Sequence, residues 1–332
     1  MHKHVRQNQK NNMKCKICSN SKNLTKYKVK EMMFGFKDEF SYFQCGECNC
    51  LQIDKIPNNM DKYYPLNYYS YAKPSQSIRS KLSAIIKIKR DTYALFQKGF
   101  IGKFINKYKP VNDPHLKILF EISININSKI LDVGCGSGNF LQNLKKMGLN
   151  NLLGIDPYLE KDIKYKSGLE IHKKSIDLVE EKMDIIMFHH SFEHINNPVE
   201  TLISVSKLLK ENGYCIIRIP TVSSYAWKHY RENWVQLDAP RHFFLHSIES
   251  MDIITKKASL YIEKIVYDSS EFQFLGSERY LKNIPLRDPI LNEAIFSRSE
   301  IQSFKTKAEA LNREEQGDAC AFLIRKLHND VA

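Results

Sequence analysis

The chain has 332 residues, of which 42% are hydrophobic and 26% charged, and its net charge is +13. This length allows one large domain and a small one. No apolar run reaches the roughly 18–20 residues that a membrane-spanning helix needs. The first residues, MHKHVRQNQKNNMK, lack the apolar core of a signal peptide. We therefore expect a cytoplasmic protein whose eight cysteines are metal ligands or free thiols rather than disulfides.

The positive charge is concentrated in two segments. Residues 1–30 contain nine Lys and Arg and no acid, and residues 81–110 contain eight Lys and Arg with one acid, Asp91. The rest of the chain is slightly acidic. A basic N-terminal region is compatible with nucleic-acid binding, but the remaining sequence does not favour it.

Two Cys-x-x-Cys pairs, Cys15 with Cys18 and Cys45 with Cys48, lie near the N-terminus. Each pair presents two thiolates from one tight turn, and two pairs complete the tetrahedral site that structural zinc prefers. A redox pair would need a βαβ context, and a catalytic zinc would need an open position, usually with His ligands. The sequence therefore predicts a zinc-ribbon domain over residues 1–56.

Between the cysteine pairs, apolar residues alternate with polar ones in a way that suits short strands. The alternating pairs are Tyr27 and Val29, Phe34 and Phe36, and Phe40 and Tyr42. Because a domain of this size buries only a small hydrophobic core, a bound metal ion would supply much of its folding free energy. Cys50 follows closely and is a second candidate for the place of Cys48 in the site.

Residues 57–110 link this ribbon to the rest of the chain. The stretch PNNMDKYYPLNYYSYAKPS, residues 57–75, is rich in Tyr and bracketed by prolines, which is typical of an irregular segment. Its tyrosines could pack the ribbon onto the body of the protein or line the mouth of a substrate site. Residues 76–109 have a basic, helical pattern and are expected to form a connector.

From residue 129 onward, apolar strand segments alternate with amphipathic helices. Strands are predicted at 130–133, 152–156, 184–188 and 214–219, and helices from Phe140 to Gly148 and over 199–212. This alternation predicts an α/β fold with a doubly wound parallel sheet, in a domain spanning residues 111–332. Ligands in this architecture bind at the carboxyl ends of the strands.

The stretch ILDVGCGSGNF, residues 130–140, predicts a strand that runs into a glycine loop, with Gly134, Gly136 and Gly138 at alternating positions. The dinucleotide fingerprint would place its third glycine where Asn139 stands, and no Gly-Lys-Ser/Thr completes a P-loop. Asp156 ends the next strand, where a carboxylate can accept hydrogen bonds from both hydroxyls of a ribose. The loop and the acid indicate an adenosine-containing cofactor, either a dinucleotide or another compound.

Four segments occur in order over residues 128–222: ILDVGCGSGNFL, LLGIDP, MDIIMFHHSFEHINNP and LLKENGYCIIRIP. In this order they resemble the class I S-adenosylmethionine-dependent methyltransferases, whose sheet is Rossmann-like and seven-stranded. The resemblance implies that S-adenosylmethionine is the cofactor. It also implies a set of cofactor-binding residues: Asp132, Gly134, Gly136 and Gly138 at the methionine part, Asp156 at the ribose, Ser175 and Ile176 at the adenine, and His190 in the pocket wall.

Further segments extend the resemblance to a bacterial subgroup that carries an N-terminal four-cysteine ribbon. These segments are YYPLNYYSY, WVQLDAPRHFFLHS (234–247), FLGSERYLKNIPL (274–286) and LNREEQGDACAFLIRK (311–326). Members often accompany glycan, surface-polysaccharide or secondary-metabolite pathways. The resemblance therefore implies a small polar acceptor, such as the hydroxyl of a sugar or sugar nucleotide. Sugar C-methyltransferases carry a similar zinc module with a further C-terminal domain, which makes C-methylation the less favoured reaction.

Two histidines are candidates for the general base that a hydroxyl acceptor would use. His242 lies in a predicted acceptor-binding insertion at about 221–250, and we expect it to act as the base or to position the acceptor. His194 belongs to a Glu193–His194 pair that matches the family. This pair could instead be structural and hold the following loop in place.

Several alternatives stay open at this point. Arg241 could pair with a phosphate or carboxylate of the acceptor, or could anchor its own loop through Asp238. The basic N-terminal region makes an RNA methyltransferase the enzymatic alternative. A non-catalytic scaffold of the same fold would show an eroded glycine loop or would lack Asp156, and both features are intact. The sequence determines neither the methylated atom nor the oligomeric state.

Overall fold

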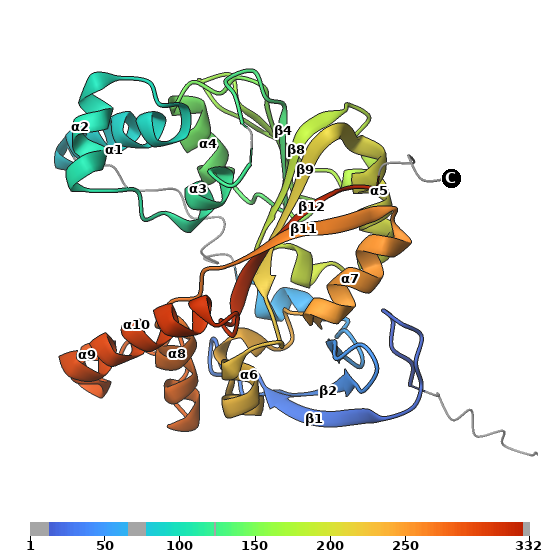
Figure 1. Ribbon diagram of the computed structural model, residues 1–332. Coiled ribbons are helices and arrows are strands. Elements are labelled where there is room, and N and C mark those ends of the chain that lie inside the picture. The colour runs from blue at the N-terminus through green and yellow to red at the C-terminus, as the bar shows by residue number, and fades with distance from the viewer. Residues whose placement is uncertain (1–12, 66–77, 123, 328–332) are drawn as a thin grey trace, which may run out of the picture.

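The computed structural model describes residues 13–65, 78–122 and 124–327, and its centre is an eight-stranded sheet (Figure 1). The strand order is β11-β12-β9-β8-β4-β5-β7-β6. The strands are β4 (Ile130–Val133), β5 (Leu152–Ile155), β6 (Ile163–Lys164), β7 (Glu170–His172), β8 (Met183–His189), β9 (Leu209–Pro220), β11 (Leu260–Tyr267) and β12 (Ala319–Lys326). The five strands from β9 to β7 run parallel, whereas β12 and β6 pair antiparallel with their neighbours. The α/β prediction is confirmed, but the sheet is mixed and has one strand more than the expected seven.

Helices cover both faces of this sheet (Figure 1). Those on one face include α3 (Pro114–Leu119) and α4 (Asn139–Lys146), and those on the other include α5 (Pro198–Leu208) and α7 (Ile248–Lys257). Residues of β8 alternate between the two cores. Ile185 and Met187 join the cluster that contains the apolar residues of α3 and α4, and Ile186 and Phe188 join the one that contains those of α5 and α7. Burial on both faces explains why this strand is a continuous apolar run.

The helix predicted over 199–212 is too long. The structure ends α5 at Leu208 and begins β9 at Leu209. Gly213 therefore lies inside a strand, where a Cβ atom would come within 2.9 Å of the Asp184 carbonyl oxygen on β8. The glycine permits close approach of two backbones and does not end a helix.

The N-terminal sheet contains β1 (Leu24–Lys30), β2 (Glu39–Cys45), β3 (Leu51–Ile53) and β10 (Phe244–Leu245), in that order. The fourth strand thus comes from the predicted acceptor-binding insertion. The alternation at Phe34 and Phe36 does not form a strand, because the Glu31 carboxylate accepts hydrogen bonds from both backbone N–H groups at 3.0 Å and closes a loop. The other two pairs lie in β1 and β2, as predicted.

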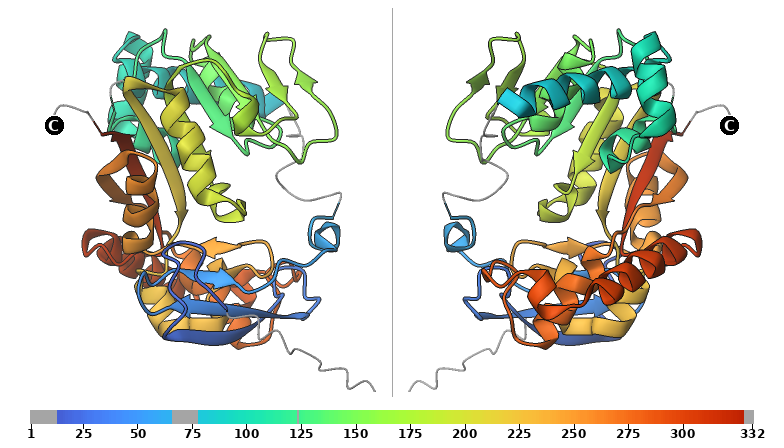
Figure 2. Two further views of the ribbon diagram at one scale, coloured as in Figure 1. Left: turned by 90° about the vertical axis from the view of Figure 1, so that its right-hand side faces the viewer. Right: turned by 90° about the vertical axis from the view of Figure 1, so that its left-hand side faces the viewer.

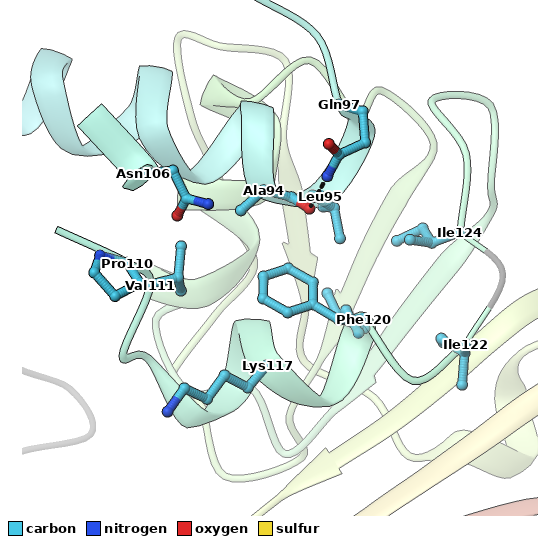
Figure 3. Close-up of a pocket in the computed structure, with 11 residues that line it drawn as sticks. Ala94, Leu95, Gln97, Asn106, Pro110, Val111, Lys117, Phe120, Ile122 and Ile124 are labelled. Atoms are coloured by element: carbon cyan, nitrogen blue, oxygen red, sulfur yellow. Dashed lines mark hydrogen bonds between the residues drawn. The ribbon is translucent and has the colours of Figure 1, made fainter. Parts of the chain in front are cut away.

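The connector consists of two helices, α1 (Ile78–Phe96) and α2 (Phe100–Tyr108), which confirms its helical pattern. A short 3-10 helix, η1 (Met60–Tyr63), precedes them, and residues 66–77 of the Tyr-rich segment lie outside the described residues. A pocket between α1, α2 and α3 is lined by residues such as Ala94, Asn106 and Phe120 (Figure 3). None of the predicted cofactor or catalytic residues lines this pocket.

The remaining helices gather with the N-terminal sheet at the end of the main sheet toward which β9 points (Figures 1 and 2). They are α6 (Tyr225–Tyr230), α8 (Phe272–Leu281), α9 (Asn292–Ile295) and α10 (Arg298–Arg313), with short 3-10 turns η4 (Phe192–His194), η5 (Arg231–Asn233) and η6 (Val235–Leu237). Another 3-10 turn, η3 (Ile176–Leu178), packs beside α5. The carboxyl ends of the parallel strands therefore face this second layer. Among the described residues, no helix is long and apolar enough to cross a membrane.

Candidate functional site

The glycine loop joins β4 to α4, and Asp156 at the end of β5 holds it. One carboxylate oxygen of Asp156 accepts a hydrogen bond from the Gly136 N–H at 2.9 Å, and the other accepts one from the Tyr158 N–H at 2.9 Å. Gly134 has φ +71°, and a Cβ atom there would lie 2.5 Å from the Cβ of Ser191. Glycine at 134 is therefore favoured for two reasons: it adopts the left-handed conformation without strain, and it leaves room for Ser191 in the segment after β8.

Two carboxyl groups are buried beside this loop. Burial, with a smaller contribution from the nearby charge of Asp156, raises the pKa of Asp132 to about 8. Burial also raises the pKa of Asp156, although its hydrogen bonds from Tyr158 and Gly136 oppose the shift. Two desolvated carboxyls at the carboxyl edge suit a positively charged ligand. S-adenosylmethionine carries such charge on its sulfonium and amino groups, so the residues present fit this cofactor.

Ser175 and Ile176 lie at the start of η3, after β7, which pairs with β5. Ile176 is buried and Ser175 is half-buried. Asp156 is tied to the same region because its backbone N–H donates to the His172 carbonyl oxygen at 3.0 Å. The residues predicted to flank the adenine and the acid predicted to bind the ribose therefore lie at the same edge of the sheet.

His189 and His190 point to different surroundings. Burial holds the pKa of His189 well below its usual value, and its ring packs edge-on against His115 and Phe140, on the side of α3 and α4. His190 has φ +51°, and its ring contacts Arg218 on β9. Its Nδ1 lies 3.4 Å from the Glu193 carboxylate. His189 therefore lies on the side of α3 and α4, whereas His190 lies beside Glu193 and Arg218.

The tertiary structure brings the two candidate catalytic histidines together. The rings of His194 and His242 meet edge to face with their centroids 4.7 Å apart. Nδ1 of His194 lies 2.8 Å from the Arg241 carbonyl oxygen, and Nδ1 of His242 lies 2.7 Å from the Gln236 carbonyl oxygen. Because a carbonyl oxygen only accepts, each Nδ1 carries a proton, and Nε2 is the ring nitrogen left for other contacts.

Glu193 lies between these imidazoles and is fully buried. Its Oε1 is 3.8 Å from Nε2 of His242. Neither carboxylate oxygen forms a hydrogen bond within the part of the chain that the structure describes. Burial alone would raise the pKa of Glu193, but the neighbouring His190, His194 and His242 lower it to about 2. The group is therefore a buried anion, and Nδ1 of His190 at 3.4 Å forms no well-aligned hydrogen bond with it.

Arg241 anchors its own loop and does not face an acceptor. Its guanidinium is fully buried, donating to Asp238 at 2.6 Å and to Glu31 of the ribbon at 3.0 Å. The Tyr42 hydroxyl, also from the ribbon, donates to the His242 carbonyl oxygen at 2.8 Å. Of the two roles that the sequence left open for Arg241, the structure supports the anchor. The ribbon thereby positions the loop that carries His242.

We expect Glu31→Gln to lower the free energy of unfolding by about 3–5 kcal/mol, because it leaves the buried Arg241 charge partly unpaired. Urea unfolding measures this change. The matched control is Asp252→Asn, which removes an exposed ion pair with Lys256 and should cost less than about 1 kcal/mol. Equal effects of the two substitutions would contradict the anchoring role.

The four predicted metal-binding cysteines form a compact cluster. The Sγ atoms of Cys15, Cys18, Cys45 and Cys48 all lie within 4.8 Å of one another. Cys50 lies outside this set, and its thiol points to the Leu51 carbonyl oxygen at 3.8 Å. The structure thus places Cys48, rather than Cys50, with the other three.

The surroundings of Cys15 favour a thiolate. The contact with Cys48, the backbone N–H of Ile17 and the side-chain amide of Gln52 together lower the pKa of Cys15 to about 4, against the effect of burial. Thiolates with N–H donors are the form that binds zinc, so the residues present fit this metal. Gln52 carries no motif signal in the sequence because its role depends on the folded ribbon.

Sequence reasoning missed two residues that shape the site, Ser191 and Arg218. The Ser191 hydroxyl donates to the Val133 carbonyl oxygen at 2.6 Å and ties the loop after β8 to β4. Arg218 contacts His190. The Tyr64 hydroxyl lies 3.3 Å from Nδ1 of His194, whereas Tyr63 packs against the ribbon. Tyr63 therefore packs the ribbon, which is one of the two uses suggested for the Tyr-rich segment, and Tyr64 contacts a candidate catalytic histidine.

The chain is similar to several known proteins. The ubiquinone biosynthesis O-methyltransferase of Pelagibacter ubique (strain HTCC1062) is 26% identical over 208 residues, which covers 55% of this chain and 85% of the relative. An S-adenosylmethionine-dependent methyltransferase from Archaeoglobus fulgidus has 19% identity and a TM-score of 0.41, covering 69% of this chain and all of its own. A cyclopropane synthase from Mycobacterium tuberculosis has 13% identity and a TM-score of 0.42, covering 76% of this chain and all of its own.

The methyltransferase domain family matches residues 97–265, about half of the chain. The matched segment contains the glycine loop, Asp156 and the candidate histidines. The chain therefore belongs to the methyltransferase domain family and is an S-adenosylmethionine-dependent methyltransferase.

Proposed function

We propose that this enzyme methylates a hydroxyl of a small polar acceptor, a sugar or sugar nucleotide, in glycan or secondary-metabolite biosynthesis. The observation that carries the proposal is the pair of Nε2 atoms on His194 and His242. Neither forms a hydrogen bond among the described residues, although both rings are fixed through Nδ1. Two oriented lone pairs beside the glycine loop are suited to receive an acceptor hydroxyl.

When bound, S-adenosylmethionine supplies a methyl group on a positively charged sulfur that is a good leaving group. The chain then has to hold the acceptor oxygen in line with that methyl group. Asp132, Asp156 and the glycine loop hold the cofactor, with Ser175 and Ile176 at the adenine and His190 as a wall. When no metal ion is bound to the two histidines, Nε2 of His242 accepts the hydroxyl proton as a general base, and His194 orients the same hydroxyl.

The proposal includes a structural zinc ion held by Cys15, Cys18, Cys45 and Cys48. Its support is the cluster of four thiols within 4.8 Å and the N–H donors that stabilise the Cys15 thiolate. Zinc in such a site is fully coordinated by protein and does no chemistry of its own. It would stabilise the ribbon that anchors the loop bearing His242.

We expect His242→Ala to lower kcat by roughly 10²–10⁴-fold, the usual contribution of general acid–base catalysis, with little change in cofactor affinity. Single-turnover rates and calorimetric titration with S-adenosylmethionine separate the two effects. His229→Ala, which changes an exposed histidine of the same insertion, is the matched control. Full activity of the His242 variant would rule out its role.

The acceptor class can be tested without knowing the acceptor. Purified enzyme and methyl-labelled S-adenosylmethionine are added to small-molecule, glycan, protein and RNA fractions of a cell lysate. Label in the small-molecule or glycan fraction is the expected result. RNase-sensitive label would overturn the acceptor class and would assign a function to the basic N-terminal residues.

A further inference from the structure

We propose that Glu193, His194 and His242 bind a divalent transition-metal cation that holds the acceptor hydroxyl. One potential ligand atom from each residue lies within 4.8 Å of the other two. The inference rests on the proposed function, because it concerns the same site. It replaces direct proton transfer to His242 by coordination of the hydroxyl to the cation.

The separation of the ligand atoms is close to that of a metal site. Oε1 of Glu193 is 3.8 Å from Nε2 of His242. Bonds of about 2.0–2.2 Å to one cation would bring adjacent ligand atoms to roughly 3.0–3.5 Å. For Glu193 and His242, a shift of less than an ångström in the separation of these two atoms would reach this range.

Both histidines have the hydrogen bonding that metal ligands need. In each ring Nδ1–H donates to a backbone carbonyl oxygen, that of Arg241 for His194 and that of Gln236 for His242. Such bonds fix the tautomer and direct the Nε2 lone pair toward the metal.

Glu193 supplies the second, independent observation. Its side chain is fully buried, and neither oxygen forms a hydrogen bond among the described residues, although Nδ1 of His190 lies 3.4 Å from Oε1. The nearby buried cation, Arg241, is occupied by Glu31 and Asp238. A buried carboxylate without hydrogen bonds costs free energy that a bound cation would offset.

Two imidazoles and one carboxylate suit zinc, manganese, iron or cobalt in the divalent state, and leave positions open for substrate oxygens. The bound acceptor hydroxyl would lose its proton to water, since coordination lowers its pKa. The resulting oxygen then bonds to the methyl carbon as the carbon–sulfur bond breaks. The electron pair of that bond stays on sulfur, which yields S-adenosylhomocysteine.

The test uses full-length protein with its ribbon zinc retained, and Mn²⁺ as the probe, because thiolate sites favour softer metals. Electron paramagnetic resonance should show one tightly bound Mn²⁺ per chain, which Glu193→Gln and His242→Ala lose and Glu193→Asp partly restores. The His229→Ala control should bind as the unaltered protein does. Retained S-adenosylmethionine affinity would show that each variant is folded.

Equal Mn²⁺ binding by the unaltered protein and the Glu193 variant would overturn the metal site, as would no bound Mn²⁺ at all. Methyl transfer adds a further distinction, measured in the acceptor fraction identified above. If chelation and Glu193→Gln leave it unchanged while His242→Ala abolishes it, the metal inference fails and general-base catalysis by His242 stands. If Mn²⁺ binds as expected but no fraction accepts label, the proposed function fails and the metal site stands.

Discussion

Cys15→Ser is expected to prevent binding of the zinc ion proposed for the ribbon and to abolish methyl transfer, although Cys15 lies outside the methyltransferase motifs. Loss of one thiolate leaves an incomplete tetrahedral site, and so small a ribbon depends on its metal for folding. The ribbon in turn supports the acceptor loop. β3 pairs with β10, and the Ser247 hydroxyl donates to the Cys48 carbonyl oxygen at 2.6 Å.

Elemental analysis measures the zinc content of this variant, and labelled methyl transfer measures its activity. The matched control is Cys50→Ala, which changes a buried thiol of the same ribbon outside the four-cysteine cluster. It should retain zinc and activity. Calorimetry should also show that Cys15→Ser still binds S-adenosylmethionine, since Asp156 and the glycine loop lie in the other layer. Full zinc content after Cys15→Ser would refute the assigned ligand set.

Asp156→Ala is expected to weaken S-adenosylmethionine binding by about 30-fold or more. Two hydrogen bonds to a charged carboxylate contribute roughly 1.5–3 kcal/mol each, and about 2 kcal/mol already corresponds to 30-fold. The substitution also releases the Gly136 and Tyr158 N–H groups that the carboxylate now binds, so the loop loses its shape.

Calorimetric titration measures the affinity directly. Asp162→Ala is the control, because Asp162 is an exposed acid in the segment between β5 and β7 that pairs with His172. It should leave the dissociation constant within about twofold, as surface pairs contribute little. The dissociation constant of Asp156→Asn should lie between those of Asp156→Ala and Asp162→Ala, since an amide can accept a hydrogen bond but carries no charge. Unchanged affinity in Asp156→Ala would contradict the ribose assignment.

The parts of the site that the sequence could predict are local. The glycine loop, the strand before it and Asp156 occupy one short stretch, and their chemistry depends on residue type and spacing. The strands β4, β5 and β8 lie within a residue or two of their predicted limits for the same reason. The boundary between α5 and β9 was wrong because pairing with β8, a tertiary contact, overrode a local Asn-Gly stop signal.

The sequence by itself determined the fold class, the cofactor loop and the two cysteine pairs, since each depends on periodicity or on ligands a few residues apart. Only the tertiary structure decided the use of Arg241, the exclusion of Cys50 and the meeting of His242 with Glu193 and His194. These outcomes join segments that are far apart in the chain, such as Glu31 with Arg241. No local pattern encodes such contacts, because they form only when β10 pairs with β3 of the N-terminal sheet and brings the loop before it against the ribbon.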